Sequence, residues 1–281
     1  MSDVSGRGAR QDAVGVAMGI GTSRRAVVLG VLGARGGAGT STLAALTADR
    51  LARLTSTVLV DLDPVGGGVD VTVGIEDADG ARWPELAGAR GDVPGQDVLA
   101  LLPRWGSCAV LSADRTGASP ELDPDVVADV LHALAGAVGA LVLDLPRGGV
   151  LPGVRPDRPG AGGSVPADGA SAAGTLLPAC DLVALVARRD LRSVAGALAV
   201  RPRLVAAGAP AGLVVPGRAP GGLAVAELAA AVDLPVLWSG PARGAVARGG
   251  ERGLLPRRGP AASAAGAVVA QVEAAMTRWS G

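Results

Sequence analysis

Residues 30–46, GVLGARGGAGTSTLAAL, have the pattern of a buried strand, a glycine-rich turn and the first turns of a helix. Because glycine has no Cβ atom, the backbone N–H groups of such a turn can converge on one anion. The helix that follows presents the positive end of its dipole to the same point. The glycines of the turn are Gly33, Gly36, Gly37 and Gly39. The stretch therefore predicts a phosphate-binding loop.

The rest of the chain alternates short apolar runs with stretches rich in Ala and Leu. The apolar runs are continuous, which is typical of strands buried on both faces of a parallel sheet. We expect strands at 26–33, 56–63, 107–113, 139–146, 180–187, 211–217 and 234–240, and helices near 41–54, 123–137, 190–206, 222–232 and 261–278. This order predicts an α/β fold with a doubly wound, mostly parallel sheet, in a three-layer domain of the P-loop NTPase type that spans residues 25–281.

The composition limits the classes of protein that need to be considered. Hydrophobic residues make up 49% of the 281 residues, but Phe and Tyr are absent, so Ala, Val and Leu must fill the core. All 26 basic residues are arginines and the net charge is zero, which gives no overall preference for nucleic acid or an anionic membrane. Cys108 and Cys180 are expected to be buried thiols. Without a signal peptide or a run of about 20 apolar residues, the chain is expected to be cytoplasmic, with no membrane span.

Two segments do not fit the alternation of strands and helices. Residues 1–24 are polar, rich in glycine and aperiodic, and they are expected to form a disordered N-terminal tail. Residues 147–170 are rich in Gly, Pro and Ala, which predicts a flexible loop directly after the strand that ends at Leu145. This loop either responds to a ligand or is a tolerated insertion.

The dinucleotide template G-x-G-x-x-G is one interpretation of the glycine-rich turn. It would begin at Gly37, but its third glycine falls on Thr42. Asp61 does lie about 20 residues further on, where this template places the partner of the ribose. The template therefore stays open as an alternative.

The P-loop template G-x-x-x-x-G-K-S/T is the other interpretation. It places Ala34 at the first glycine, Gly39 at the second, Thr40 at the lysine and Ser41 at the metal-binding hydroxyl. This match is poor by itself, because the lysine is the residue that reaches the phosphates.

Acidic residues at strand ends favour the P-loop interpretation. Asp61 and Asp63 end one predicted strand, and Asp144 ends another. The carboxyl ends of parallel strands border the crevice in which ligands bind. A carboxylate opposite a P-loop serine is what coordination of Mg²⁺ requires. The alternative is that strand ends near turns simply tolerate Asp.

These motifs resemble those of the MinD/ParA group of proteins. ARGGAGTST resembles its deviant Walker A motif, x-K-G-G-x-G-K-S/T, while DLDP resembles its second acidic motif and LVLDLP its Walker B motif. The longer stretch DLDPVGGGVDVTVGIEDADGARWPEL resembles the actinobacterial branch of CpaE/TadZ-like proteins, which is associated with septum-site determination or with secretion and pilus genes. The resemblance runs from about Ala26 to the C-terminus.

The resemblance implies a site for ATP or ADP with Mg²⁺. The residues that would surround the phosphates are Gly36, Gly37, Ala38, Gly39, Thr40, Ser41 and Thr42. Ser41 would bind Mg²⁺, with Asp144 in the outer shell and Asp61 near it. Asp63 would orient the attacking water if the site is active.

Two departures from the family pattern concern positive charge. Thr40 replaces the P-loop lysine, and the chain contains no lysine that could substitute for it. Arg35 stands where the signature lysine reaches the partner's phosphates across a dimer, and a guanidinium keeps that charge. Three outcomes stay open: weak nucleotide binding without turnover, an empty site whose fold serves partner binding, or slow hydrolysis that uses Arg35.

The favoured function is that of a CpaE/TadZ-like positioning or scaffold protein with a degenerate ATP site. Its partners would be proteins of the division or the secretion and pilus machinery, and it would be a homodimer recruited to the septum or pole. One rival is an active, ATP-switched MinD/ParA-type ATPase. Another is a partition protein that binds DNA nonspecifically through its arginines, which are Arg188, Arg189, Arg192, Arg243, Arg248, Arg252, Arg257 and Arg258.

Overall fold

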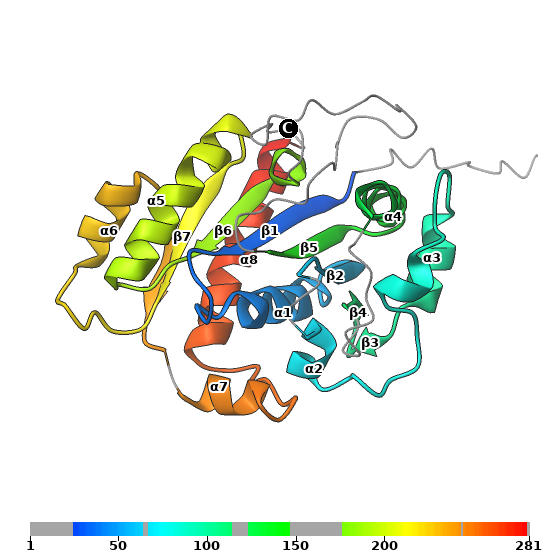
Figure 1. Cartoon of the computed structure of the whole chain (residues 1–281), viewed down its shortest axis with the longest axis horizontal. Coiled ribbons are helices and arrows are strands. Elements are labelled where there is room, and N and C mark those ends of the chain that lie inside the picture. The colour runs from blue at the N-terminus through cyan, green and yellow to red at the C-terminus, as the bar shows by residue number, and fades with distance from the viewer. Residues whose placement is uncertain (1–24, 64–66, 114–122, 147–175, 243, 280–281) are drawn as a thin grey trace, which may run out of the picture.

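The computed structural model describes residues 25–63, 67–113, 123–146, 176–242 and 244–279. The predicted 1–24 tail and the predicted 147–170 loop lie outside these ranges. Figure 1 shows a central sheet with helices packed against it. The sheet has eight strands in the order β3-β4-β2-β5-β1-β6-β7-β8.

Every strand pair is parallel except β3 with β4. The strands are β1 (Val27–Gly33), β2 (Thr57–Asp61), β3 (Arg104–Trp105), β4 (Cys108–Leu111), β5 (Ala140–Leu145), β6 (Leu182–Val186), β7 (Ala211–Pro216) and β8 (Val236–Gly240). This confirms the doubly wound, mostly parallel sheet. The antiparallel strand β3 at one edge is the exception that the sequence did not reveal.

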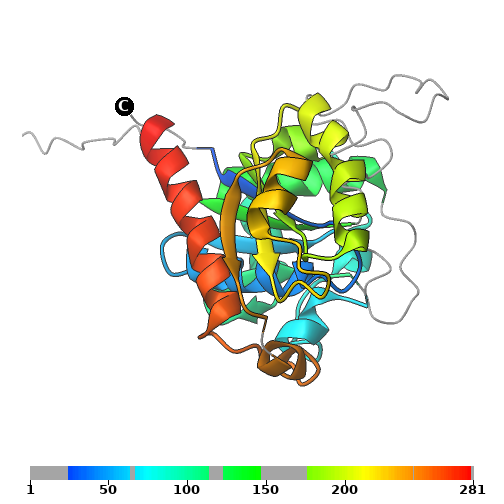
Figure 2. The ribbon, with the colours of Figure 1, turned by 90° about the vertical axis from the view of Figure 1, so that its left-hand side faces the viewer.

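Helices cover both faces of the sheet and complete the three layers. They are α1 (Thr40–Leu51), α2 (Val69–Val73), α3 (Gly95–Leu101), α4 (Pro124–Ala137), α5 (Leu191–Ala206), α6 (Val225–Val232), α7 (Gly244–Gly250) and α8 (Pro260–Trp279), with 3-10 turns at Trp83–Leu86 and Leu177–Ala179. One core lies under α4, α5 and α6, and the other under α1 and α8. Figure 2 shows α8 on one side of the sheet and α5 and α6 on the other.

The central strands β1, β2, β4 and β5 are buried on both faces, as their continuous apolar sequences predicted, whereas the edge strand β8 has no buried residue. All seven residues of β1 are buried, and neighbours such as Val28 and Leu29 belong to opposite cores because successive side chains point to opposite faces. Small aliphatic side chains fill both cores, and the thiols of Cys108 and Cys180 are buried among them, as expected. Trp83 is also buried and packs in the core under α4.

The predicted strands and helices agree with the observed ones to within three residues at each end. The prediction missed α2, α3 and α7, which have five to seven residues each. Helix α7 occupies the glycine-rich stretch Gly244–Gly250, where no helix was expected. Helices this short offer too few residues for a helical period to emerge.

Close packing of α5 against the glycine-rich loop fixes the position of the loop. A Cβ atom on Gly196 would collide with the carbonyl oxygen of Ala34. The backbone N–H of Ala34 also donates to Val186 O in β6 at 2.9 Å. The loop is therefore held to β6 and α5 by contacts that leave no room for a side chain at position 196.

Gly196→Ala is expected to destabilise the protein by about 2 kcal/mol or more, because either α5 or the loop must move to admit the methyl group. Gly136→Ala is the matched control, since Gly136 also lies in a helix but a Cβ there would meet nothing within 4 Å. That variant should gain about 0.5–1 kcal/mol from helix propensity. Urea denaturation measures both changes, and equal effects would contradict the packing described for Gly196.

Candidate nucleotide site

The loop between β1 and α1 has the backbone geometry of an anion-binding turn. Gly37 and Gly39 adopt φ values of 69° and 97°, which favour glycine, and a Cβ at either position would meet nothing within 4 Å. Gly39 is also the N-cap of α1, so no side chain caps the helix, and its first turn contains no acidic residue. Backbone N–H groups at this helix end can therefore bind a phosphate.

Thr40 begins α1 and is only partly buried. Its hydroxyl lies against Gly33 at the end of β1, so closely that a Cβ on Gly33 would collide with it. A threonine side chain carries no charge and is too short to cross the loop from this position. The cation within the loop itself is Arg35.

Arg35 is held by α5 of its own chain. Its Nε donates to Oγ of Ser193 at 3.2 Å, and Nη2 contacts a carboxylate oxygen of Asp190 at 3.1 Å. Asp190 is the N-cap of α5 and also accepts the backbone N–H of Ser193 at 2.9 Å. A contact of Arg35 with the phosphates of a second subunit would require these two bonds to be exchanged. The sequence did not indicate this pairing.

Asp61 and Asp144 lie side by side at the carboxyl edge of the sheet. They face each other in the register of β2 and β5, and both are buried. Burial is the main cause that raises the pKa of Asp144 to about 7, with the neighbouring charge of Asp61 adding to it. Burial likewise raises the pKa of Asp61 to about 6, against the lowering effect of hydrogen bonds from backbone N–H groups.

The two carboxylates have different partners. Ser41, the predicted metal-binding residue, lies near enough to Asp144, the predicted outer-shell acid, that its hydroxyl lowers the pKa of that carboxyl. Asp61 instead accepts backbone N–H groups on both oxygens, from Asp63 at 3.0 Å and from Val69 at 2.8 Å. Because Val69 is the first residue of α2, Asp61 fixes the start of that helix.

A metal ion at this site would depend on a ligand for most of its coordination. Within the described ranges, no group of three or more His, Cys, Asp or Glu side chains is placed to hold a metal. Mg²⁺ commonly binds through one or two protein oxygens together with phosphate oxygens and water. The paired Ser41 and Asp144 fit that mode, in which bound Mg²⁺ would neutralise phosphate charge.

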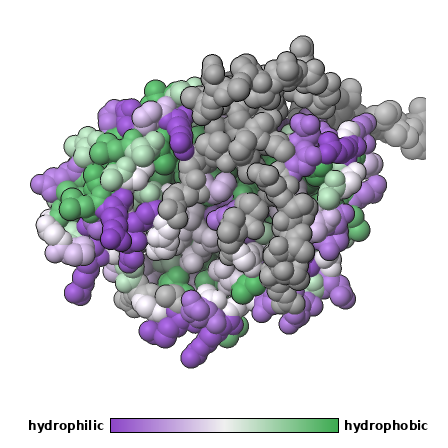
Figure 3. Space-filling model, in the orientation of Figure 1, coloured by the Kyte–Doolittle hydropathy of each residue, from purple (hydrophilic) through white to green (hydrophobic). Residues whose placement is uncertain are grey.

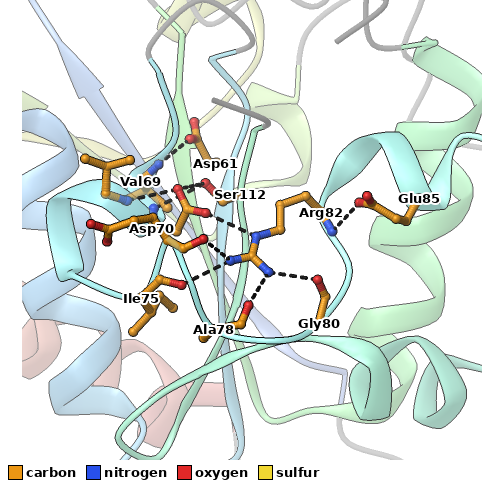
Figure 4. Close-up of polar contacts among 11 residues, drawn as sticks. Asp61, Val69, Asp70, Ile75, Ala78, Gly80, Arg82, Glu85 and Ser112 are labelled. Atoms are coloured by element: carbon orange, nitrogen blue, oxygen red, sulfur yellow. Dashed lines mark hydrogen bonds and ion pairs between the residues drawn. The ribbon is translucent and has the colours of Figure 1, made fainter. Parts of the chain in front are cut away.

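Arg82 organises the loop that follows α2 (Figure 4). Its Nε donates to Asp70 at 3.1 Å, and Asp70 in turn accepts the hydroxyl of Ser112 at 3.0 Å. The remaining four guanidinium N–H bonds donate to carbonyl oxygens of Ile75, Glu76, Ala78 and Gly80. All five donors of the guanidinium are thus used.

The Arg82–Asp70 pair stabilises the two segments that contact Asp61 at the end of β2. Asp70 lies in α2, whose first N–H binds Asp61, and Trp83 next to Arg82 donates its Nε1 to Asp61 O at 2.7 Å. Sequence reasoning did not find this pair. An available signal was the charged Asp70 within the apolar run VDVTV, because a buried charge needs a partner.

Arginines proposed as DNA contacts have varied surroundings. Arg189 donates to Gly217 O at 3.0 Å, and Arg257 contacts Asp49 at 3.3 Å and lies over the ring of Trp105. At least Arg189 and Arg257 therefore serve internal contacts.

The arginines proposed as DNA contacts also include Arg188 and Arg243. The guanidinium of Arg188 lies beside Gly217, whereas Arg243 lies outside the described residues. The single histidine, His132, is exposed on the surface of α4.

Arg82→Ala is expected to cost about 3–5 kcal/mol of stability, because it leaves the carboxylate of Asp70 buried without its cation. Arg82→Lys should lose less but still lose stability, since one ammonium cannot serve five acceptors. The control is Arg90→Ala, whose pair with Asp123 is more than 40% exposed on both side chains and should cost no more than about 1 kcal/mol. Similar losses in Arg82→Ala and Arg90→Ala, measured by denaturation, would show that the Arg82 pair adds no more than a surface pair.

Asp144→Asn is expected to change how stability depends on pH. Because its pKa is raised to about 7, the folded protein binds more protons than the unfolded chain between about pH 4 and pH 7, so stability falls as the pH rises through that window. The variant should be more stable than the parent at pH 8, by on the order of 2 kcal/mol. The exposed residue Asp92 provides the control Asp92→Asn. Identical pH profiles for the parent and Asp144→Asn would contradict the raised pKa of the buried Asp144 carboxyl.

A strand, a glycine-rich loop and a helix, with a serine facing a buried aspartate from a neighbouring strand, define the fold of a P-loop NTPase. Solved structures of MinD and ParA ATPases share this fold. The chain aligns with the MinC:MinD cell division protein complex of Aquifex aeolicus at a TM-score of 0.67 and 17% identity, covering 89% of this chain and 96% of that one.

Two further solved structures agree with this assignment. The septum site-determining protein MinD with Mg-ADP from Pyrococcus horikoshii gives a TM-score of 0.64 at 18% identity, covering 88% of this chain and 96% of that one. The ParA family ATPase from Chlorobium tepidum gives 0.62 at 17% identity, covering 82% and 90%. At these identities the likeness establishes the MinD/ParA P-loop fold.

Sequence relatives add a narrower similarity. No family model matches the chain. Uncharacterized proteins from two strains of Mycobacterium tuberculosis are 40% identical over 240 residues, which is 85% of this chain and 61% of theirs. The chain thus spans about three fifths of the length of these relatives. Among the described helices, none combines the length and apolar character needed to cross a bilayer.

Proposed function

We propose that this chain is a positioning or scaffold protein, similar to CpaE/TadZ-like proteins, whose ATP site is degenerate. The domain would comprise residues 25–281 and act in the cytoplasm, with recruitment to the septum or pole. The observation that carries the proposal is Thr40 at the position of the P-loop lysine, in a loop whose glycine geometry is otherwise kept.

Loss of the lysine removes binding energy from the phosphates. A lysine ammonium would reach two phosphate groups, and each charge-assisted hydrogen bond contributes roughly 1.5–3 kcal/mol. Two such contacts correspond to about 10²–10⁴-fold in nucleotide affinity. The backbone of residues 36–39, Thr42 and the paired Ser41 and Asp144 would still hold ATP or ADP with Mg²⁺, but weakly.

The proposed partners are proteins. MinD of Aquifex aeolicus, whose fold this chain shares, is described in complex with MinC, a cell division protein. By analogy, this chain would work as a homodimer with components of the division machinery or of the secretion and pilus machinery. The two uses differ in the partner, while the P-loop domain would serve both as a scaffold.

An active ATPase is the second candidate, because Arg35 keeps a positive charge at the loop. In that case Asp63 would orient the attacking water, and Arg35 would contact the phosphates of a second subunit. The hydrogen bonds of Arg35 with Asp190 and Ser193 argue against that role in the arrangement described above. This candidate requires the arginine to leave α5.

The affinity for ATP and ADP, with and without Mg²⁺, tests the proposal directly. Thr40→Lys is expected to tighten nucleotide binding by about 10²–10⁴-fold over the parent chain, because it restores the missing ammonium in a preserved loop. Thr40→Met is the matched control, since methionine supplies similar length without charge and should bring no such gain. Isothermal titration calorimetry measures all three proteins.

Two results would contradict the proposal. Tight binding of Mg-ATP by the parent chain, with γ-phosphate release that Asp63→Ala abolishes, would identify an active ATPase. Equal gains from Thr40→Lys and Thr40→Met would show that the missing charge does not explain weak binding.

A further inference from the structure

Helix α5 has two apolar sides, and only one of them packs on the sheet. Its buried residues are Ser193, Ala197, Val200 and Leu204. On the opposite side Leu191, Leu198 and Val205 are 87%, 44% and 59% exposed. These three residues are spaced by seven, so they lie in one row along the helix.

Small apolar residues widen this row into a continuous surface, here called the α5 outer face. It consists of Leu191, Ala195, Leu198, Ala199, Pro202, Val205 and Ala206, all of which are exposed. In Figure 3 the green, hydrophobic surface gathers over the flank that α5 and α6 occupy in Figure 1. The face is thus about four turns long and contains no charged residue.

A helix of this kind is unusual at a free surface. Surface helices normally carry polar residues opposite their core side, and helices that are apolar all round are normally buried. Single exposed leucines need no explanation, but contiguous apolar patches mark interaction sites. The α5 outer face therefore calls for a covering partner.

Charges beside the face indicate the chemistry of that partner. The charged residues within α5 are Arg192, Arg201 and Arg203, and the helix contains no acidic residue. Helical geometry places Arg192 and Arg203 along one border of the face and Arg201 along the other. Arg201 is bound to Asp233, whereas Arg192 is exposed beside Leu191 at the start of the helix, where an acidic residue of a partner can reach it.

We propose that the α5 outer face binds an amphipathic helix of another protein, with aliphatic residues along one side and acidic residues beside them. Such a helix would cover Leu191, Leu198 and Val205 and place carboxylates next to Arg192. This surface is separate from the nucleotide loop, so the proposal does not depend on whether the site binds ATP.

A second copy of this chain is a poorer occupant because of charge. The α5 helix of a second copy contains no acidic residue that could pair with Arg192. Pairing of two α5 helices would therefore leave Arg192 without a carboxylate at a surface from which water is excluded.

The test uses a synthetic peptide of about 18 residues as the probe, with leucine at i, i+3, i+7, i+11 and i+14 and glutamate at the flanking positions. Fluorescence anisotropy with the full chain is expected to give a Kd of about 10–100 μM. Affinity should fall as salt concentration rises, because Arg192 contributes charge attraction. A peptide of the same composition in scrambled order should not bind, and one with lysine in place of glutamate should bind at least tenfold more weakly.

Variants locate the binding to the face. Leu198→Asp and Arg192→Glu are each expected to weaken binding of the acidic peptide at least tenfold. Leu101→Asp is the matched control, because Leu101 is 55% exposed at the end of α3, and it should bind like the parent chain. All three positions are exposed, so circular dichroism should confirm that the variants fold.

Four results would overturn the proposal. They are absence of peptide binding, equal binding of the scrambled peptide, and dimerisation of the chain that Leu198→Asp abolishes in sedimentation equilibrium. The fourth is sedimentation with vesicles of anionic phospholipid that Leu198→Asp prevents, which would assign the face to a membrane surface.

Discussion

The geometry of the carboxyl edge of the sheet follows from two buried carboxylates, Asp61 and Asp144, that lie on neighbouring strands. Two like charges in a dry environment repel each other, and burial disfavours both charged forms. Backbone N–H groups of Asp63 and Val69 donate to Asp61, and the hydroxyl of Ser41 lowers the pKa of Asp144. The bond from Val69 also attaches α2 to the end of β2, so the acids contribute to the local fold.

Thr40 stands where a P-loop has lysine, and this difference concerns both the phosphate-binding loop and the acidic strand ends. In a P-loop with lysine, an ammonium would lie between the phosphates and the acidic strand ends and would attract both. Here the loop offers backbone N–H groups, while the cation of Arg35 is directed to Asp190 on α5. Burial is the main cause that raises the pKa of Asp61 to about 6 and that of Asp144 to about 7, and the charge of Asp61 adds to the shift at Asp144. Under the proposed function, Thr40 would weaken phosphate binding and leave the two acids without a nearby ammonium.

Much of the fold could be predicted because it depends on local patterns. Continuous apolar runs indicated the seven parallel strands, and the glycines between β1 and α1 indicated the loop. The sequence could not reveal contacts between distant residues, such as Arg82 with Asp70 or Arg35 with Asp190. These pairs form only when folding brings the two segments together, and neither residue type nor spacing in the sequence identifies the partners. The short helix α7 was not predicted because its seven residues are rich in glycine and show little helical pattern.

Helix α5 connects the two surfaces on which the proposals depend. Its N-terminal cap, Asp190, binds Arg35, and Gly196 packs against the carbonyl of Ala34 in the loop. The α5 outer face lies on the same helix, and its first residue, Leu191, directly follows the cap. A partner bound there would contact α5, whose opposite side packs against the loop without free space, since position 196 admits no side chain. Any displacement of α5 would therefore reach the loop and Arg35 before it reached Asp61, which is bound by the first residue of α2.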